Sequence, residues 1–317
     1  MRGACPLCGE PRDQIAKLGL VDLISAYRRR FGIDVAQLFG DSRSLSLLQC
    51  EGCGLAGFEP AVTGDEEFYK GMSKWWGDRL PEVGSLEQRP DYKRVLHHIK
   101  PSDDVLEIGG AGLLLPRHLP DPARYVGLEL NPSEVEKAVA NGIDMRTESV
   151  EDHARSNANR YDVVCHVQVI EHVAAPGMFL DACVACLKPG GRLIVACPNN
   201  RSFLALEPDN ILNMPPHHVS WFSRKPLEWI AEHWRLRVVD IVEEPLEPDY
   251  HREFARLLWL HAAGRLWRNS EFFTLDGARF RMADMFARGM ARATAPLFKH
   301  VASAIPGHTI TAVYKKS

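Results

Sequence analysis

Four cysteines in the first part of the chain occur in two units of identical spacing. The stretches CPLCG and CEGCG place Cys5 with Cys8 and Cys50 with Cys53, and a glycine follows each pair. Two such turns can present four thiolates to one ion, which completes the tetrahedral shell of zinc and leaves no open position. The sequence therefore predicts a structural zinc site within a module of residues 1–70.

Three histidines further along the chain offer a different chemistry. His172 follows Glu171 directly, and His217 and His218 stand side by side in the stretch NMPPHHVSWFS. An imidazole with its ordinary pKa near 6.5 exchanges protons near neutral pH, and it also binds metal ions. For His217 and His218 taken alone, catalysis, metal binding and packing are all compatible with the residue types.

Short apolar runs alternate with helical patterns from residue 103 onward. Strands are expected at 105–108, 124–130, 161–167, 192–197, 238–242 and 309–314. Such alternation is typical of a mostly parallel sheet with helices on both faces. Asn131 and Pro132 have the residue types of a helix N-cap and a first helical position. A third CxxC pair, Cys183 and Cys186, lies in a helical pattern and is expected to pack in the core.

Two features of this alternating region suit a nucleotide-like ligand. A glycine-rich loop, GGAG at 109–112, follows the first strand and lets a ligand approach the backbone. Glu129 ends the second strand, where a carboxylate can accept hydrogen bonds from ribose hydroxyl groups. Proteins that bind NAD use the same arrangement, so these two features alone leave the cofactor open.

The order of five motifs resembles that of the class I S-adenosylmethionine-dependent methyltransferases. VLEIGGAG, YVGLELNP, RYDVV, VIEHV and LKPGGRLIVACPN follow one another between residues 91 and 244. The resemblance implies an α/β fold with a Rossmann-like, seven-stranded methyltransferase sheet and S-adenosylmethionine as cofactor. We expect the core at residues 71–245, a helical insertion at 246–306 and the final strand of the core at 307–317.

The same resemblance implies a set of cofactor contacts. Glu107 and the loop glycines would hold the methionine part, Glu129 the ribose, and the loop after the third strand the adenine. Two residues at the end of the fourth strand would border the cofactor. The residues assigned in this way are Glu107, Gly109, Gly110, Gly112, Glu129, Leu130, Ser149, Val150, His166 and Gln168.

A four-cysteine module ahead of this core resembles the sugar C-methyltransferases of deoxysugar pathways. Those enzymes methylate a nucleotide-linked keto sugar, and a Glu-His pair after the fourth strand lies at their reacting centre. The resemblance gives that place to Glu171 and His172. We interpret His172 as the general base, which takes a proton from a carbon beside a ketone or from a hydroxyl, and Glu171 as its orienting or substrate-binding partner. The alternative interpretation of His172 is a helix cap that packs under the cofactor.

The loop that carries His217 and His218 is expected to border the acceptor pocket. In methyltransferases similar to this chain, a histidine-containing loop after the fifth strand lies there. At least one of the two histidines would contact the substrate as a binder or a second base. Zinc is not expected at this loop, because the four cysteines already complete a zinc site. Ser223 is expected to cap the helix that follows.

Composition and charge limit the remaining function classes. The chain has 317 residues and a net charge of −3, yet residues 251–317 hold eleven Lys and Arg against four Asp and Glu. Helices predicted at 253–268 and 278–303 carry Met and aromatic residues that suit internal packing, a dimer surface, a lid or a membrane surface. No apolar run is long enough to predict a spanning helix, and no basic stripe with interleaved aromatics indicates nucleic acid binding.

The sequence thus predicts a methyltransferase of a small biosynthetic intermediate, with a sugar or similar polar acceptor favoured. The chain has eight cysteines and no signal-peptide pattern, which indicates reduced thiols and a cytoplasmic protein. Two alternatives stay open: an O-methyltransferase of a phenolic or lipid-like acceptor, and a non-catalytic zinc- or cofactor-binding module. The expected partner is a small-molecule acceptor such as a nucleotide-linked sugar, with homodimer formation and peripheral membrane contact as further options.

Overall fold

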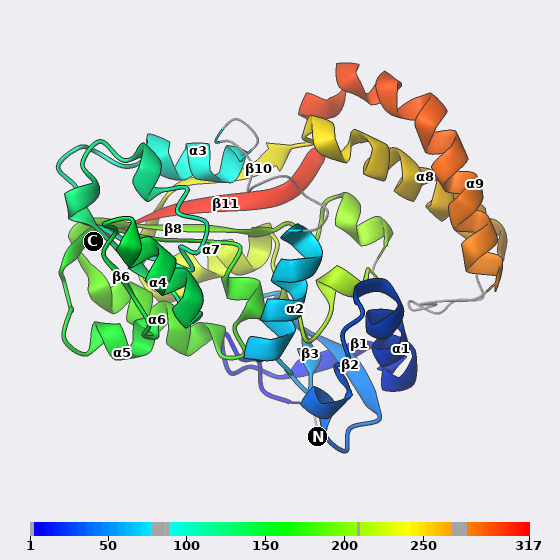
Figure 1. Cartoon of the computed structure of the whole chain (residues 1–317), viewed down its shortest axis with the longest axis horizontal. Helices are drawn as coiled ribbons and strands as arrows, with labels where there is room; N and C mark the ends of the chain where they lie inside the picture. The colour runs from blue at the N-terminus through cyan, green and yellow to red at the C-terminus, as the bar shows by residue number, and fades with distance from the viewer. Residues whose placement is uncertain (1–2, 78–85, 87–88, 208–209, 268–277) are drawn as a thin grey trace.

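A seven-stranded sheet forms the centre of the computed structural model, which describes residues 3–77, 86, 89–207, 210–267 and 278–317 (Figure 1). The strands lie in the order β10-β11-β8-β7-β4-β5-β6. Strand β11 is antiparallel to both of its neighbours, whereas the other pairs are parallel. The strands are β4 (Val105–Ile108), β5 (Tyr125–Leu128), β6 (Met145–Arg146), β7 (Tyr161–Val167), β8 (Leu187–Pro198), β10 (Leu236–Pro245) and β11 (Pro306–Lys316). The predicted seven-stranded α/β sheet is confirmed.

Helices cover both faces of this sheet because its strands are apolar on both sides. Phe179 and Leu227, from α6 and α7, belong to the buried cluster on one face. Tyr92 and Val95, from α3, belong to the buried cluster on the other. The helices of this region are α3 (Pro90–His97), α4 (Pro132–Ala140), α5 (Val150–Ala154), α6 (Pro176–Cys186) and α7 (Arg224–His233). The direction of strand order reverses at β4, so the carboxyl ends of β4 and β7 flank the usual ligand position of such sheets.

Local signals in the sequence account for several helix boundaries. Asn131 caps α4 by accepting a hydrogen bond from the Ser133 amide, and Pro132 is the first helical residue, as predicted. Helix α7 begins directly after Ser223, although the Ser223 side chain makes no capping hydrogen bond. Both cysteines of the CxxC pair in α6 are fully buried, which confirms that this pair packs in the core.

The N-terminal segment forms a second, four-stranded sheet with the order β1-β2-β3-β9. Its last strand comes from a distant part of the sequence, because β9 follows β8 of the large sheet in the chain. Buried Ile211 and Met214 from the same stretch join the cluster between the helices of this segment. The elements are β1 (Arg12–Gly19), α1 (Leu20–Phe31), β2 (Ser44–Cys50), β3 (Ala56–Glu59), α2 (Glu66–Gly77) and β9 (Ser220–Trp221). The expected module boundary between residues 70 and 71 lies within α2.

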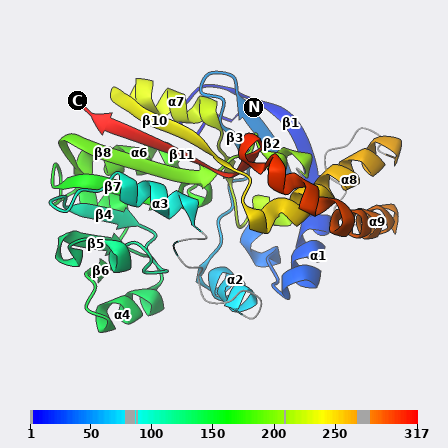
Figure 2. The ribbon, with the colours of Figure 1, turned by 90° about the horizontal axis from the view of Figure 1, so that it is seen from above.

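Two long helices, α8 (His251–Trp267) and α9 (Ala278–Thr294), pack on each other and project away from the large sheet (Figures 1 and 2). Buried Arg256 ties them together through ion pairs with Glu207, Glu253 and Asp284. The predicted helix at 278–303 is wrong in its last part. Helix α9 ends at Thr294 and short 3-10 turns follow, because Pro296 cannot continue an α-helix.

Exposed apolar side chains on α9 form a stripe at helical spacing. Met282, Met285 and Phe286 are each more than half exposed, whereas Ala283 and Ala287 face α8 and are buried. Residue 268 of the helix predicted at 253–268 lies outside the described residues. Among the described residues, no helix is long and apolar enough to cross a membrane.

Candidate functional site

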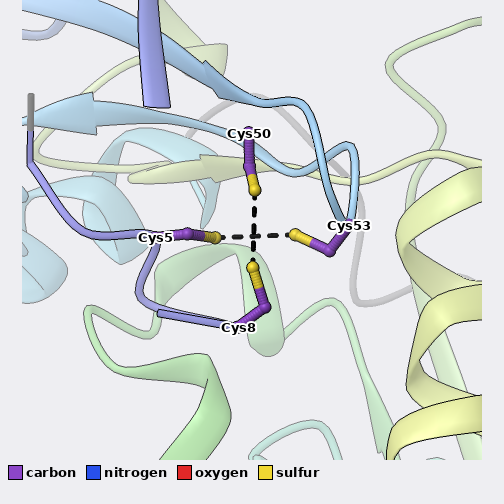
Figure 3. A group of neighbouring side chains, drawn as sticks. All are labelled: Cys5, Cys8, Cys50 and Cys53. Atoms are coloured by element: carbon purple, nitrogen blue, oxygen red, sulfur yellow. Dashed lines mark hydrogen bonds between the residues drawn. The ribbon is translucent and has the colours of Figure 1, made fainter. Parts of the chain in front are cut away.

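The four cysteines of the N-terminal segment converge on one point (Figure 3). The Sγ atoms of Cys5 and Cys53 lie 3.5 Å apart, and those of Cys8 and Cys50 lie 3.4 Å apart. A zinc ion bound to four sulfurs at about 2.3 Å holds neighbouring sulfurs about 3.8 Å apart. The four cysteines predicted to share one site therefore lie together, and the spacing of their sulfurs fits a tetrahedral thiolate site.

The glycine after each CxxC pair has a structural role. Gly9 and Gly54 both have a φ of +79°, which is the left-handed region that favours glycine. In each turn the amide of that glycine donates a hydrogen bond to the carbonyl of the first cysteine, Cys5 or Cys50. The two turns are thus built alike, which explains why the CxxCG unit occurs twice.

The cysteine cluster is part of the main hydrophobic core. Cys5, Cys50 and Cys53 pack in the same buried cluster as Phe179 and the other inner residues of α6 and α7. Two further contacts reach across: the Gly177 amide at the start of α6 donates to the carbonyl of Pro6, and Lys225 Nζ on α7 donates to the carbonyl of Glu51. The two CxxCG turns therefore connect the N-terminal sheet to the helices that cover the large sheet.

At the end of β4, a tight loop passes over a buried carboxylate. Glu107 is 1 % exposed; its Oε2 accepts a hydrogen bond of 2.6 Å from Tyr125, and its Oε1 has no partner among the described residues. Burial raises the pKa of Glu107 to about 7. Gly109 has a φ of +81°, and a Cβ at Gly110 would lie 2.6 Å from the Tyr125 hydroxyl. Glycine is thus required at both positions.

Gly112, in the same loop, is exposed in a turn. The carboxylate of Glu129 follows β5 at the same edge and is half-buried. Its Oε1 accepts a hydrogen bond of 2.9 Å from the Asn131 amide, and burial raises its pKa. Leu130, the next residue, is 71 % exposed. A carboxylate next to an exposed apolar side chain suits a nucleoside: the carboxylate can accept hydrogen bonds from the ribose, and the apolar side chain can pack on the flat face of the base.

The residues assigned to adenine lie at the start of α5. Ser149 is the N-cap, and its Oγ accepts a hydrogen bond of 3.1 Å from the Asp152 amide. Val150 is 2 % exposed and packs in the core. Ser149 is partly open at the edge of the sheet, so the assignment of both residues to adenine stays a prediction.

Two residues at the end of β7 differ in surroundings. His166 is fully buried with its ring edge against Phe179 of α6, and neither ring nitrogen has a hydrogen-bond partner among the described residues. Gln168, just beyond the strand, has a φ of +57° and donates from Nε2 to Thr309 Oγ1 at 3.3 Å. A left-handed conformation at a non-glycine residue is costly and is often found at ligand sites. A cofactor contact stays a prediction for both.

Three histidines meet beyond the carboxyl ends of β7 and β8. His172 follows β7, while His217 and His218 come from the loop after β8, and one ring nitrogen of each lies within 4.8 Å of the others. The rings of His217 and His218 are stacked at 4.5 Å, and the ring of His172 stands nearly perpendicular to both at 4.8 Å. The predicted closeness of these three residues is thus present in the structure.

Oxygen acceptors around the cluster fix the orientation of each ring. His172 Nδ1 lies 2.5 Å from the carbonyl oxygen of His217. His217 Nδ1 lies 2.8 Å from the carbonyl oxygen of Leu212, and His218 Nδ1 lies 3.0 Å from Asn213 Oδ1. Since these oxygens only accept, each Nδ1 donates, and in a neutral imidazole the lone pair is then on Nε2.

Burial determines the charge state of the cluster. It lowers the pKa of His172 to about 3 and also lowers the pKa values of His217 and His218, so the three rings are neutral near pH 7. Glu171 is 1 % exposed, its pKa is raised to about 8 by burial, and neither carboxylate oxygen has a hydrogen-bond partner among the described residues. Glu171 Oε1 lies 3.8 Å from His172 Nε2.

No sequence pattern points to Asn213, yet this residue orients the ring of His218. Asn213 is 5 % exposed, and its amide nitrogen donates a hydrogen bond of 2.6 Å to Asn200 Oδ1, which fixes its oxygen toward the histidine. Tyr69, from α2 of the N-terminal segment, brings its hydroxyl to 3.4 Å from His172 Nδ1. A buried asparagine in a proline-rich loop carries no periodic signal that could have identified it.

Comparison with known proteins gives a consistent picture for the central part of the chain. A family model described as a methyltransferase domain matches residues 82–241, which is half of the chain. Ubiquinone biosynthesis O-methyltransferases of Salmonella newport and Salmonella typhimurium are 33 % identical over 144 residues, covering 40 % of this chain and 60 % of their own length. The chain thus spans less than two thirds of these curated relatives.

Among solved structures, the chain is similar to an S-adenosylmethionine-dependent methyltransferase from Archaeoglobus fulgidus. That alignment has 16 % identity, a TM-score of 0.48, and covers 80 % of this chain and 100 % of the other. A possible histamine N-methyltransferase from Thermotoga maritima aligns with 16 % identity and a TM-score of 0.49, covering 80 % of this chain and 98 % of the other.

Proposed function

This chain belongs to the methyltransferase-domain family, and on that premise we propose that it transfers a methyl group from S-adenosylmethionine to a small-molecule acceptor. One observation carries the proposal: the glycine loop over Glu107, the carboxylate of Glu129 and the three-histidine cluster all lie beyond the carboxyl ends of neighbouring strands. A cofactor and an acceptor bound there would meet at the point where the strand order reverses.

On the cofactor side, carboxylates and backbone amides are proposed to bind S-adenosylmethionine. Glu107 and the amides of the glycine loop would hold the methionine part, whose ammonium group would supply the partner that Glu107 Oε1 lacks. Glu129 would accept hydrogen bonds from the ribose, with Leu130 against the base. When bound, S-adenosylmethionine supplies a methyl group on an electrophilic sulfonium.

On the acceptor side, His172 is the proposed proton acceptor. Its Nδ1 donates to the carbonyl of His217, so its Nε2 is available to take the proton that the acceptor loses as the new bond to methyl forms. Because burial lowers the pKa of His172 to about 3, it is a weak base. The proposed acceptor proton is that of a carbon beside a ketone or of a phenol.

A polar acceptor such as a nucleotide-linked keto sugar is the substrate class we favour. The four-cysteine module ahead of the core supports it, as do the polar groups just beyond β7, where Gln168 donates to Thr309. A second candidate is O-methylation of a phenolic acceptor, because the 33 % identical relatives are ubiquinone biosynthesis O-methyltransferases. The four cysteines are proposed to hold one structural zinc ion in either case.

Calorimetry with S-adenosylmethionine tests the cofactor site directly. Glu129→Ala should weaken binding about 10- to 150-fold, because hydrogen bonds to a charged group contribute about 1.5–3 kcal/mol. Glu136→Ala, an exposed change on α4, is the control and should bind like the parent protein. Undiminished binding by Glu129→Ala would overturn the assignment of the cofactor site. A separate, labelled methyl-transfer screen with keto sugars, phenols and lipid precursors distinguishes the two acceptor classes.

A further inference from the structure

The three-histidine cluster has a geometry that simple packing does not require. We propose that His172, His217 and His218 form a second metal site, distinct from the four cysteines, which binds a divalent first-row transition ion such as Zn²⁺ through three Nε2 atoms. The inference goes beyond the proposed methyltransferase function, and it rests on that function only for the role of the ion.

The hydrogen bonds around the cluster are those of metal-binding histidines. In metal sites, each ligating imidazole donates its other N–H to a carbonyl, an amide or a carboxylate, which fixes the ring and leaves the remaining nitrogen to the metal. All three rings do this here, with the oxygens of His217, Leu212 and Asn213 as acceptors. In each ring the nitrogen that does not donate is the one left to bind a metal ion.

The spacing of the rings leaves room for an ion with only a small adjustment. One ring nitrogen of each histidine lies within 4.8 Å of one ring nitrogen of each of the other two. A tetrahedral ion with bonds of about 2.0–2.1 Å to nitrogen requires about 3.4 Å between its ligands. The nitrogens would therefore approach one another by about an ångström and a half at most. His172 is 21 % exposed, so the cluster can be reached from outside.

A buried carboxylate beside the cluster is an independent sign of a missing cation. Glu171 is 1 % exposed, and neither of its oxygens has a hydrogen-bond partner among the described residues. The Oε1 atom of Glu171 lies 3.8 Å from Nε2 of His172, one of the proposed ligands. An unpaired buried carboxylate is costly, and a divalent ion held by the three imidazoles would offset that cost.

Three protein nitrogens leave one position of a tetrahedral ion open. This is the ligand count of catalytic zinc sites, in contrast to the closed four-thiolate site. If the proposed function holds, an oxygen of the acceptor takes the open position, and the ion lowers the pKa of the acceptor proton. In that state the lone pair of His172 would belong to the ion, so His172 would act as a ligand, and the proton that the acceptor loses would pass to the carboxylate of Glu171, whose Oε1 lies 3.8 Å from His172 Nε2.

Metal titration of the full chain tests the site without any methyl transfer. The protein is first loaded with one equivalent of Zn²⁺ to fill the cysteines and is then titrated with Co²⁺, whose visible absorption reports its ligands. We expect a second equivalent to bind, with nitrogen-ligand absorption and without a thiolate-to-cobalt band. Absence of a second equivalent in the parent protein would overturn the inference, whatever the variants do.

Substitution by asparagine removes the proposed ligand while keeping the orienting hydrogen bond. The amide nitrogen of Asn lies close to the place of His Nδ1, so His217→Asn and His218→Asn retain a donor and lose Nε2. Each should weaken the second equivalent by more than about 100-fold, beyond the loss caused by removing an orienting partner. His233→Asn, at an exposed histidine of α7, is the matched control and should leave both equivalents intact.

The same variants separate this inference from the proposed function. Binding of S-adenosylmethionine should be unchanged in His218→Asn, since the residue lies on the acceptor side. A second equivalent that binds equally well to both variants and the parent would sink the metal site. Methyl transfer that continues undiminished in a variant without its second metal would reject the role of the ion and leave the methyltransferase proposal standing.

Discussion

The four-cysteine cluster and the three-histidine cluster differ in how their members reach one another. Each cysteine pair is local, with two residues between its members and a left-handed glycine that closes the turn. The histidines come from segments 45 residues apart and meet only because the large sheet aligns the ends of β7 and β8. The first cluster is closed by its own turns, whereas the second depends on the tertiary fold and stays partly open.

The largest effect is expected at the closed cluster. Cys53→Ser removes a fully buried thiol from the cluster, so the proposed zinc should no longer bind tightly and several kcal/mol of stability should be lost, given about 10–16 kcal/mol of binding free energy for structural zinc. Metal content and thermal melting check this. Cys183→Ala, at a buried cysteine outside the site, should keep its zinc and lose about 1–2 kcal/mol at most. Full zinc in Cys53→Ser would show that the cluster is not a metal site.

At the open cluster, His172→Asn should lower turnover strongly. We expect a loss of about 10²–10⁴-fold in kcat, the range for a lost proton-transfer group, with unchanged binding of S-adenosylmethionine. The comparison with His217→Asn sharpens the result, since that change removes a ligand but not the proposed base. Equal losses in the two variants support the ion, which is our expectation, whereas a loss confined to His172 would assign the proton to the imidazole.

The smallest effect is expected at the residue that orients a ring. Asn213→Ala leaves His218 Nδ1 without its acceptor, so the second equivalent of Co²⁺ should bind about 10- to 100-fold more weakly. Asn213→Asp keeps an oxygen at that place and should restore binding, which a purely structural role would not predict. Asn141→Ala, at an exposed asparagine of α4, serves as the control. Equal affinity of Asn213→Ala and the parent would show that ring orientation is not limiting.

The sequence predicted those parts of the fold whose signals are local or periodic. The strands at 105–108 and 161–167 were placed at their observed bounds, and the CxxCG units identified the cysteine cluster. Strand β9 could not be predicted, because two residues cannot show a period. The predicted helix at 278–303 is longer than α9, which ends at Thr294. The Met and aromatic pattern does not mark this end; Pro296 interrupts the α-helix just after it.

For the site, sequence patterns predicted which residues lie at the carboxyl-terminal edge of the large sheet, but they did not predict how the side chains are oriented. The resemblance put His217 and His218 near His172, yet the stacked rings and the oxygens that each Nδ1 meets depend on how a loop folds against the N-terminal sheet. His166 illustrates the same limit: it ends a strand at the predicted edge, but the alternation of side chains turns its ring toward Phe179. The direction in which a side chain points depends on tertiary packing, and the spacing of residues in the sequence does not determine it.

The short strand β9 also bears on how the chain is made. Ala56 and Gly57 of β3 pair with Trp221 and Ser220, so the N-terminal sheet receives its last strand from a segment synthesised more than 160 positions later. Until that segment leaves the ribosome, β3 has an unpaired edge, which is a place where chains associate wrongly. The N-terminal sheet is therefore begun before β4 is synthesised and is completed only after β8, and the histidine loop becomes ordered in the same step.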